Sequence, residues 1–598
     1  MILQALCDYY ERLREQSDSG IAPPGYSSEK ISYALALDRD GSLVAIRDIR
    51  DTSGKKPVPT RLIVPQPPKR ASNIAPCFLW DKTSYVLGIS ASSKRTQEEH
   101  AAFKELHAVL INADDAGLQA LARFLQNWDP EQFATHPDYD EDTLDANCVF
   151  ELDGEHGYLH DRPAARAAWA VQSAAASDME TAMCLVTGKR MLVARLHPSI
   201  KGVDGAQSSG ASIVSFNLDA FESYGKAQGY NAPVSEPAAF AYATALNYLL
   251  RRSEHNRQRL RIGDTTVVFW VQAGNAASAE AAEDLMSQML NPPATDEQQT
   301  SILQTVLDTV RQGRPLTALS AQLQPDTRIF ILGLAPNASR LAIRFWITGT
   351  LQTFAVRIAT HFDDLALQPP AWKNPPSIWR LALTTAPQRA GQKSKAEDIP
   401  PQLAGELTRA VLTGNRYPRS LLVTLLMRMR ADGQITDLRV ALCKAVLVRD
   451  RRLHVKGIPK EIPMSLDLNN HEPGYLLGRL FAELENAQRA ALGKDINAPI
   501  GDRYYGAASA TPASVFPLLL RGARHHLSRL RKDKPGLAHT LDQIMGDIVS
   551  ELGTRFPRHL SLEAQGQFVI GYYQQRNTRF SKPGDIEDDA SPDSGENE

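Results

Sequence analysis

The hydrophobic pattern of this chain changes at about residue 405. Before it, short apolar runs typical of strands, such as TTVVFWVQ and RIFILGL, alternate with helical patterns. After it, nearly all apolar residues recur at helical spacing. A chain of 598 residues is also too long for one hydrophobic core. We therefore predict a multidomain α+β protein, with a mixed α/β N-terminal part containing antiparallel sheet elements, followed by a C-terminal all-α helical bundle.

Two segments of the N-terminal part predict pairs of antiparallel strands. In residues 31–50, ISYALAL and SLVAIRDI flank Asp40-Gly41, a dipeptide that tolerates the positive φ of a tight turn. In residues 182–196, AMCLVTGKRMLVARL places strand-like runs on both sides of Gly188. Residues 96–126 have helical spacing instead.

The C-terminal part predicts a series of amphipathic helices. Pro418 opens one helix, and Thr511-Pro512 opens another with Thr as the N-cap and Pro at the first position, where a missing N–H costs little. Apolar stripes follow, namely Leu421, Leu422, Leu425, Leu426 and Met429 in the first helix and Val515, Phe516, Leu519, Ala523, Leu527 and Leu530 in the second. The remaining helical segments are one after Met464 (Leu477, Leu480, Phe481, Leu484, Ala491), 537–551 and 562–576.

Shifts in composition predict the domain boundaries. Residues 366–405 are rich in Pro, Gln, Lys and Ala, which indicates a linker or a loosely packed connection. The predicted division is 1–110, an N-terminal subdomain with the hairpin; 111–365, a mixed α/β domain; 366–405, the Pro-rich linker; 406–463, a basic helical segment; 464–580, a helical bundle; and 581–598, a disordered acidic tail.

The composition is that of an ordinary globular protein, with 43% apolar and 22% charged residues. The net charge of −2 averages the acidic tail against basic segments and says little about partners. No two of the five cysteines have CxxC spacing, so neither a zinc ribbon nor a redox motif is indicated. The N-terminus reads as an amphipathic helix rather than a signal peptide, and no apolar run approaches the ~20 residues of a membrane span. We expect a cytoplasmic protein with no membrane partner.

No motif of catalytic or metal chemistry stands out. SGKK at 53–56 lacks the upstream glycine and following Ser or Thr of a phosphate-binding loop, and GxGxxG, HExxH and GxSxG do not occur. The acidic run 138–145 has Thr143 where a calcium loop of the EF-hand type needs glycine. His525 and His526 are adjacent, so they would point about 100° apart on a helix. We expect no enzyme activity, no cofactor and no metal, although distant side chains could still converge in the fold.

Two loops carry residues that suit duplex DNA. A proline-stiffened segment, 64–76, contains Lys69, Arg70, Ser72 and Asn73. Lys201 precedes the second loop, whose two glycines permit close backbone approach and whose polar residues are Gln207, Ser208 and Ser209. Lys and Arg suit phosphates, whereas amide side chains can read a groove edge. Ordinary solvated loops are the alternative for both.

Three further features suit nucleic-acid backbone. In residues 340–346 alternation predicts one strand face with Leu341, Ile343 and Phe345 and an opposite face with Arg340, Arg344 and Trp346. Residues 416–456, beginning with Arg416 and Arg419, contain ten Lys or Arg against three Asp. Helix 512–532 has a basic ridge at i, i+3, i+4 spacing, namely Arg521, Arg524, His525, Ser528, Arg531 and Lys532. Solvated basic surfaces are the alternative reading.

Residues 205–233 combine backbone freedom, amide side chains and aromatics, which suits wrapping another polymer. This segment, together with other blocks along almost the full chain, resembles the Csd-type CRISPR-associated family, the large subunit of the type I-C surveillance complex (Cascade). The other blocks are MILQALCDYYERL at 1–13, PPKRASNIAPCFLWDKTSYVLG at 67–88, CLVTGKRMLVARLHPSIKGV at 184–203, LGLAPNASRLAIRFW at 332–346, YLLGRLFAELENAQ at 475–488 and GYYQQR at 571–576, in the family's order.

The resemblance implies a binding subunit. It would recognise the protospacer-adjacent motif on duplex DNA through Lys69, Arg70, Ser72, Asn73, Lys201, Gln207, Ser208 and Ser209, promote R-loop formation and hold the displaced strand. The implied partners are guide RNA, target double-stranded DNA, the Cascade backbone subunits, the guide-processing subunit, a small subunit and the helicase-nuclease. The bundle 464–580 would be like that small subunit, and Met464 is predicted as an internal translation start for a self-contained product. Nucleic-acid backbone or displaced-strand contacts are predicted for Arg340, Arg344, Arg416, Arg419, Arg521, Arg524, His525, Arg531 and Lys532.

Two other functions remain alternatives. One is a metal-dependent nuclease whose acidic residues converge only in the fold. The other is a scaffold that binds only proteins, which would show no salt-dependent DNA affinity.

Overall fold

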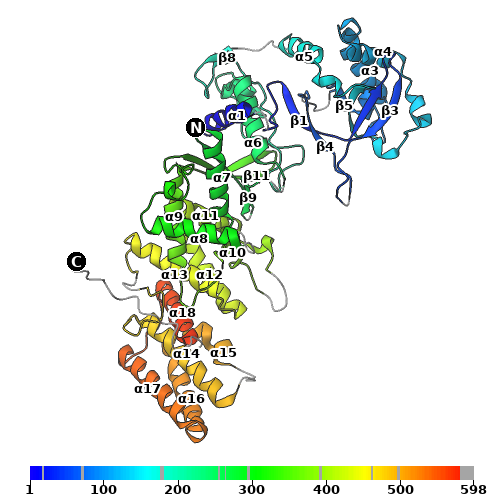
Figure 1. Ribbon diagram of the computed structural model, residues 1–598. Coiled ribbons are helices and arrows are strands. Elements are labelled where there is room, and N and C mark those ends of the chain that lie inside the picture. The colour runs from blue at the N-terminus through cyan, green and yellow to red at the C-terminus, as the bar shows by residue number, and fades with distance from the viewer. Residues whose placement is uncertain are drawn as a thin grey trace, which may run out of the picture. The chain divides into compact units, whose positions relative to one another are not determined.

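The fold was analysed in a computed structural model (Figure 1). It describes residues 1–16, 19–54, 56–68, 70, 73–175, 181–253, 256–262, 264–292, 297–372, 374–388, 394–458, 462–493 and 499–578. The chain forms two compact units, which draw on alternating stretches of sequence: unit 1 is Met1–Ile200 with Val214–Tyr248, and unit 2 is Lys201–Ile213 with Leu249–Glu598.

Unit 1 is built around a four-stranded sheet of order β3-β2-β6-β5, in which β2 and β6 run parallel. The β2–β3 pair confirms the hairpin predicted for residues 31–50, and Gly41 has the positive φ (87°) that its turn requires. Two smaller antiparallel pairs are β1–β4 and β7–β8, the latter confirming the strands around Gly188. The strands are β1 (Tyr26–Ile31), β2 (Tyr33–Leu37), β3 (Leu43–Asp48), β4 (Thr60–Pro65), β5 (Trp80–Lys82), β6 (Asn147–Leu152), β7 (Thr181–Met183) and β8 (Arg190–Leu192).

Unit 1 also contains six helices among the described residues, of which α2, α3, α4 and α5 contribute to the core of this sheet. They are α1 (Ile2–Glu15), α2 (Thr83–Val86), α3 (Thr96–His107), α4 (Ala116–Asn127), α5 (Pro163–Ala175) and α6 (Glu236–Leu249). The helical segment predicted at 96–126 is two helices, because Asp115 caps α4 by accepting from the N–H groups of Gly117 and Leu118. Each predicted domain is one continuous segment, whereas each unit combines two separate segments of the chain. In unit 1, α6 from the second segment packs on α1 from the first, and the rings of Tyr10 and Phe240 lie 5.8 Å apart, edge to face.

Unit 2 contains an antiparallel sheet of order β12-β11-β10-β9, and every element described after β12 is a helix. This arrangement confirms the α+β class and the all-helical C-terminal part. The strands are β9 (Arg259–Ile262), β10 (Thr265–Gln272), β11 (Arg328–Asn337) and β12 (Arg340–Thr350). The helices are α7 (Ala276–Leu290), α8 (Glu297–Arg311), α9 (Leu351–Leu365), α10 (Ile378–Leu383), α11 (Pro401–Thr413), α12 (Arg419–Asp432), α13 (Asp437–Arg452), α14 (Pro473–Leu492), α15 (Ile500–Ala508), α16 (Pro512–Asp533), α17 (Pro535–Leu552) and α18 (Leu562–Asn577).

The predicted apolar stripes form the core of these helices. All five stripe residues of α12 and all six of α16 are buried. The segment 366–405, predicted as a linker or a loosely packed connection, includes α10 and contributes Ile378, Leu381 and Ile399 to the core of unit 2. One hydrophobic core runs from the β10–β12 sheet into the helices of residues 464–578.

The bundle is centred on the crossing of α14 and α18. A Cβ at Gly478 would lie 2.0 Å from the carbonyl oxygen of Phe568, and one at Gly571 would lie 2.3 Å from the carbonyl oxygen of Tyr475. The two backbones therefore touch, as they do where small residues meet at a helix crossing. Helix α18 also packs on α12 and α13: a Cβ at Gly566 would lie 3.0 Å from Leu447.

Candidate nucleic-acid interface

The first predicted DNA loop, 64–76, is held to the sheet of unit 1 by Arg70. Its guanidinium forms an ion pair with both carboxylate oxygens of Asp81 and donates to the carbonyl oxygen of Ala75 (2.6 Å). It also lies over the ring of Tyr85, with 4.2 Å between its Cζ and the ring centroid. Because the Asp81 side chain is only 1% exposed, this pair is buried on the carboxylate side and anchors the loop.

Asn73 is exposed at the surface of that loop. The predictions for Lys69 and Ser72 lie outside the described residues. The guanidinium of Arg70 already binds Asp81 and Ala75 within the protein. Of the residues predicted to contact DNA in this loop, Asn73 is therefore the described one that remains a candidate.

The second predicted loop presents its three polar residues to solvent. Gln207, Ser208 and Ser209 are all exposed, between Gly205 (φ 76°) and Gly210 (φ 99°). Both glycines occupy the left-handed region that other residues avoid. The Gly210 N–H donates to the carbonyl oxygen of Gln207 (2.9 Å), which closes the turn at the tip.

The base of this loop is fixed by Asp204. Its carboxylate pairs with Arg252 (2.8 Å) and with Arg259 (2.7 Å), and its N–H donates to the Thr266 hydroxyl (3.0 Å). On the other side, Ser212 forms a bridge with Arg340 at the start of β12. The loop is therefore braced on both sides, so its tip would lose little conformational entropy on binding.

The ion pairs of Asp204 with Arg252 and Arg259 leave one net positive charge beside the loop. Asp204 neutralises one of two arginines, and the Arg252 side chain is 67% exposed. Lys201, which was predicted as a contact, is also exposed. Sequence reasoning missed Arg252, because its link to the loop is a contact with Asp204, which lies 48 residues earlier.

In unit 1, a turn within residues 205–233 carries a fully exposed aromatic residue. Tyr224 is 98% exposed and has a positive φ of 52°, a conformation that costs energy for a non-glycine residue. Asn231 braces the turn: it accepts from the Ser223 N–H (2.9 Å) and donates to the Lys226 carbonyl oxygen (2.6 Å).

The strand face predicted at 340–346 is wrong, because β12 contains a bulge. Gly333 pairs with Phe345 whereas its neighbour Leu334 pairs with Ile343, so Arg344 is an extra residue. The alternation reverses at this point. Ile343 and Phe345 consequently lie on opposite faces, and so do Arg340 and Trp346.

Trp346 belongs instead to an aromatic cluster on the sheet face opposite the helical core. The ring of Trp346 lies 5.5 Å from Trp270 and 5.6 Å, stacked, from Phe330. Trp346 and Phe330 are half-buried. Arg344 is paired with Asp264 (2.8 Å) and is 40% exposed.

The basic stretch 416–456 is largely neutralised within unit 2. Arg416 forms a bidentate ion pair with Asp450 (2.7 and 2.9 Å), and Arg419 pairs with Glu563 (2.9 Å). Two other arginines of the stretch are buried in the core and paired, Arg439 with Asp432 and Arg449 with Asp364. The charge excess counted in the sequence is therefore much smaller at the surface.

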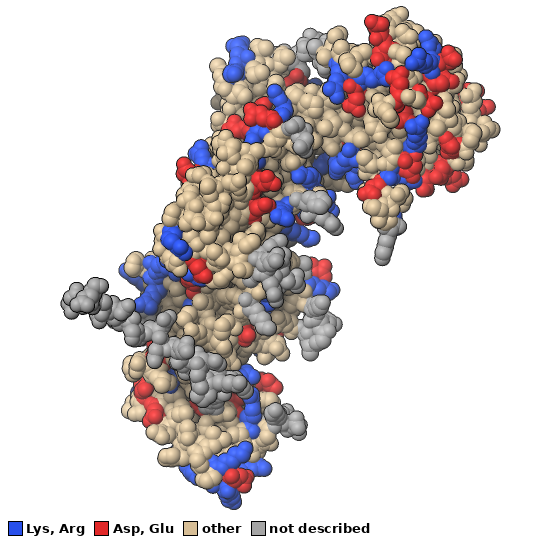
Figure 2. All heavy atoms as spheres, viewed as in Figure 1, with Lys and Arg blue, Asp and Glu red and all other residues tan. Residues whose placement is uncertain are grey.

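The ridge on α16 is the predicted basic surface that remains open. Arg521, Arg524 and Lys532 are exposed and have no ion pair with any described residue, and His525 is exposed beside them. Arg529 has the same properties and was missed, although it lies four residues after His525 and three before Lys532. Arg531 differs, since it pairs with Asp542 on α17 (2.8 Å). Figure 2 shows Lys and Arg gathered at the lower end of the bundle, where α16 lies.

Met464, the predicted internal start, is 44% exposed and lies before α14. Its carbonyl oxygen accepts from the Gln368 N–H (3.0 Å). The internal start at Met464 stays a prediction. A product that begins there would lack the contacts that α12 and α13 make with α18.

The described residues contain no group of three His, Cys, Asp or Glu side chains that could hold a metal ion. In the acidic run 138–145, Asp138 accepts from the Ile46 N–H (2.9 Å) and Asp142 lies 3.7 Å from Arg50. None of the described helices combines the length and the apolar character needed to cross a membrane.

Comparison with known proteins places the chain in a family. A family model described as CRISPR-associated protein (Cas_Csd1) matches residues 6–580. The match covers nearly the whole chain, so the chain belongs to this CRISPR-associated family, a Cascade-type subunit, as the resemblance implied. No curated protein matches the chain.

Proposed function

We propose that this CRISPR-associated chain is the non-catalytic large subunit of a type I-C surveillance complex. In this role it recognises the protospacer-adjacent motif on duplex DNA, promotes R-loop formation, holds the displaced strand and helps to recruit the helicase-nuclease. Its partners are the guide RNA, the backbone subunits, the guide-processing subunit and a small subunit made by internal translation.

The observation that carries the proposal is the braced loop around Gln207. An amide and two hydroxyls project from a base fixed by Asp204, with the exposed charge of Arg252 beside it. Amide and hydroxyl groups can read base edges, whereas an arginine beside them can hold a phosphate. A rigid polar tip next to a cation is what reading a short motif on duplex DNA requires.

The α16 ridge supports the second part of the proposal. Four exposed cations follow one side of a helix and form no ion pair with the part of the chain that the structure describes, namely Arg521, Arg524, Arg529 and Lys532. Such a row suits the phosphates of a single strand, because charge alone gives sequence-tolerant binding. In this proposal Arg70 supports the loop that carries Asn73 rather than contacting DNA.

The proposal is tested with the assembled complex and a guide of known sequence. Duplex targets would match the guide and differ only in the base pairs beside the matched segment, and permanganate reactivity of thymines would report strand opening. We expect opening to depend strongly on those flanking pairs. Equal opening with every flank would overturn motif recognition by the complex.

The nuclease alternative is tested on the purified chain alone. Incubation of bare duplex and single-stranded DNA with Mg²⁺ or Mn²⁺ should leave the DNA intact if the chain is non-catalytic. Metal-dependent cleavage that co-elutes with the chain would replace the proposed function with a nuclease.

A further inference from the structure

The aromatic cluster of Trp270, Phe330 and Trp346 forms a partly open surface at one corner of the sheet in unit 2. It lies on the face opposite the helical core, and its ring centroids are 5.5 to 5.6 Å apart. Trp270 is only 1% exposed, whereas Phe330 and Trp346 are half-buried. Because β12 is an edge strand, Trp346 is the outermost of the three rings. The exposed part of the cluster therefore belongs to Phe330 and Trp346, toward the edge of the sheet.

Exposed polar side chains flank these rings on the same sheet face. Thr348 pairs with Phe330 across the strands, and the next row along the sheet pairs Gln272 with Arg328. All three polar residues are exposed, so solvent reaches this corner of the face. Arg328 forms no ion pair with any described residue, and no described strand position on this face is Asp or Glu. The corner therefore combines stacked rings with a guanidinium that has no carboxylate partner.

Gln272 and Arg328 also line an open groove of about 750 Å³, where β10 ends and β11 begins. This volume lies within the range of about 300–1,000 Å³ that is typical of ligand sites. The first turn of α7 contributes to the lining, and a helix N-terminus adds partial positive charge. Asp326 is the acid among the lining residues, and it forms no ion pair with Arg328. The groove thus gives the ring surface a polar extension with room for a sugar and a phosphate.

The loop around Gln207 is fixed over the same sheet face. The N–H of Asp204 at its base donates to the hydroxyl of Thr266 (3.0 Å), and Thr266 lies on the face that carries Trp270. The strand register puts Trp346 two strands away from Thr266 and two residues along. At about 3.4 Å per residue and about 4.8 Å per strand, their Cα atoms are about 12 Å apart. The rings are therefore within reach of a strand that leaves a duplex at the loop.

A nucleotide within a strand matches this combination of groups. The flat face of a base stacks on an aromatic ring, and its edge forms hydrogen bonds with hydroxyl and amide groups such as those of Thr348 and Gln272. Its phosphate pairs with an arginine, here Arg328. A neutral sugar would leave this guanidinium without a counterion, and an inorganic anion would leave the rings uncovered. Stacking and charge together therefore favour a nucleotide over either of these ligands.

We propose that this corner is a base-stacking site for single-stranded nucleic acid, in which one base continues the ring stack on Trp346 and a neighbouring phosphate binds Arg328. A guide RNA and a displaced DNA strand share this chemistry. The displaced strand as the source rests on the proposed function, whereas binding of a free single strand by the chain does not.

Stacking is separated from charge by two labelled oligonucleotides of equal length, one of thymidine nucleotides and one of abasic nucleotides with the same phosphates. Fluorescence anisotropy with the full chain gives the affinity for each. Trp346→Leu should weaken binding of the thymidine strand about tenfold and leave binding of the abasic strand unchanged. Trp346→Phe keeps an aromatic ring, so it should retain most of the affinity for the thymidine strand.

Arg328→Gln should weaken binding of both strands, because both contain the phosphates. It should also lower the slope of log affinity against log salt by about 0.7. Since Arg328 is exposed, this variant keeps the test decisive even if Trp346→Leu unfolds more easily. The control Arg314→Gln removes an exposed arginine outside the sheet that also has no ion pair with a described residue, and it should bind both strands like the wild type. Equal affinity of the wild type, Trp346→Leu and Arg328→Gln for both strands would overturn the proposal.

Photocrosslinking locates the stacked base. A strand with one iodouracil couples under ultraviolet light to an aromatic ring on which the base stacks, and DNA and RNA versions compare the two sources. We expect a crosslink to Trp346 or Phe330, with DNA alone if the site serves the displaced strand and with RNA alone if it serves the guide. Crosslinks confined to other parts of the chain would overturn the proposal.

A protein partner on the same face would give a different result. Trp346→Leu would then bind both oligonucleotides like the wild type but lose a protein subunit when the complex is purified, and this outcome would overturn the stacking site. Motif-dependent opening by the complex is measured separately, so the stacking site and the proposed function can each fail without the other.

Discussion

The α16 ridge makes a quantitative prediction about salt. If Arg521, Arg524, Arg529 and Lys532 each neutralise one phosphate of a single strand, then together they contribute about 2.8 to the slope of log affinity against log salt, at about 0.7 per phosphate. A fourfold rise in salt, from 50 to 200 mM, would then weaken wild-type binding by about 50-fold more than binding by the variant with all four residues changed to Gln.

The assay is fluorescence anisotropy of a labelled single strand with the full chain at several salt concentrations. The matched control is Arg531→Gln, because the charge of Arg531 is already opposed by Asp542 at 2.8 Å. We expect this control to change the slope by less than one phosphate contact. An unchanged slope in the quadruple variant would refute the ridge as a phosphate track, and a drop of equal size in the control would refute the argument from ion pairing.

Three further predictions concern the crossing of α14 and α18, acid stability and motif reading. Gly478→Ala should lower the melting temperature by a few degrees, since overpacking typically costs about 1–3 kcal/mol or more. The control Gly546→Ala, where a Cβ meets no atom within 4 Å, should raise the melting temperature slightly. Equal melting temperatures of the two variants would contradict the backbone contact at Gly478. Burial lowers the pKa of His361 to about 3, below its unfolded value of 6.5, so the unfolded state binds the proton first as the pH falls. The free energy of unfolding of unit 2 should therefore fall by about 1.4 kcal/mol per pH unit below pH 6.5. Melting curves that do not change between pH 7 and 5 would contradict this prediction. Asn73→Ala and Gln207→Ala should each relax the dependence of strand opening on flanking base pairs without lowering binding equally for all flanks; unaltered discrimination in both would remove them as motif readers.

The features that the sequence predicts well are local. The stripe of α16 from Val515 to Leu530 depends only on helical periodicity and on Pro512 at the first position, and all six of its residues are buried. The turn at Gly41 likewise depends on two adjacent residues. For the same reason, a basic ridge on the outer side of a helix could be located before the structure was known.

The features that the sequence does not predict depend on distant partners. The bulge at Arg344 is set by pairing between β11 and β12, so simple alternation placed Phe345 and Ile343 on one face. Arg449 counted as surface charge in the sequence, but it is 1% exposed and paired with Asp364, which lies 85 residues earlier. The alternation of the chain between two units similarly depends on where α6 packs.

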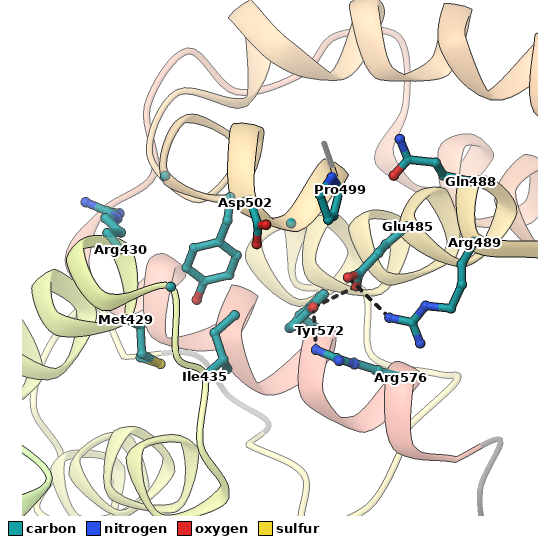
Figure 3. A pocket seen from close by; sticks show the side chains of 14 residues that line it. Met429, Arg430, Ile435, Glu485, Gln488, Arg489, Pro499, Asp502, Tyr572 and Arg576 are labelled. Atoms are coloured by element: carbon teal, nitrogen blue, oxygen red, sulfur yellow. Dashed lines mark hydrogen bonds and ion pairs between the residues drawn. The ribbon is translucent and has the colours of Figure 1, made fainter. Parts of the chain in front are cut away.

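The same limit applies to the candidate sites. The composition of the loop around Gln207 marks it as adaptable and polar, but its rigidity comes from Asp204 and its contacts with Arg259 and Thr266. A cavity beside Arg430 is lined by residues of α12, α14, α15 and α18 (Figure 3), and no short sequence motif predicts it. Residue types could be chosen from the sequence, whereas their pairing and burial could not.

The most direct test of the central claim is to express the tagged chain with its genomic neighbours, purify it at moderate salt and sequence the nucleic acid that remains bound. The account predicts a uniform guide RNA, the backbone subunits and a short C-terminal polypeptide that disappears when Met464 is changed to a residue that cannot start translation. Recovery of the chain alone, without RNA, would contradict it.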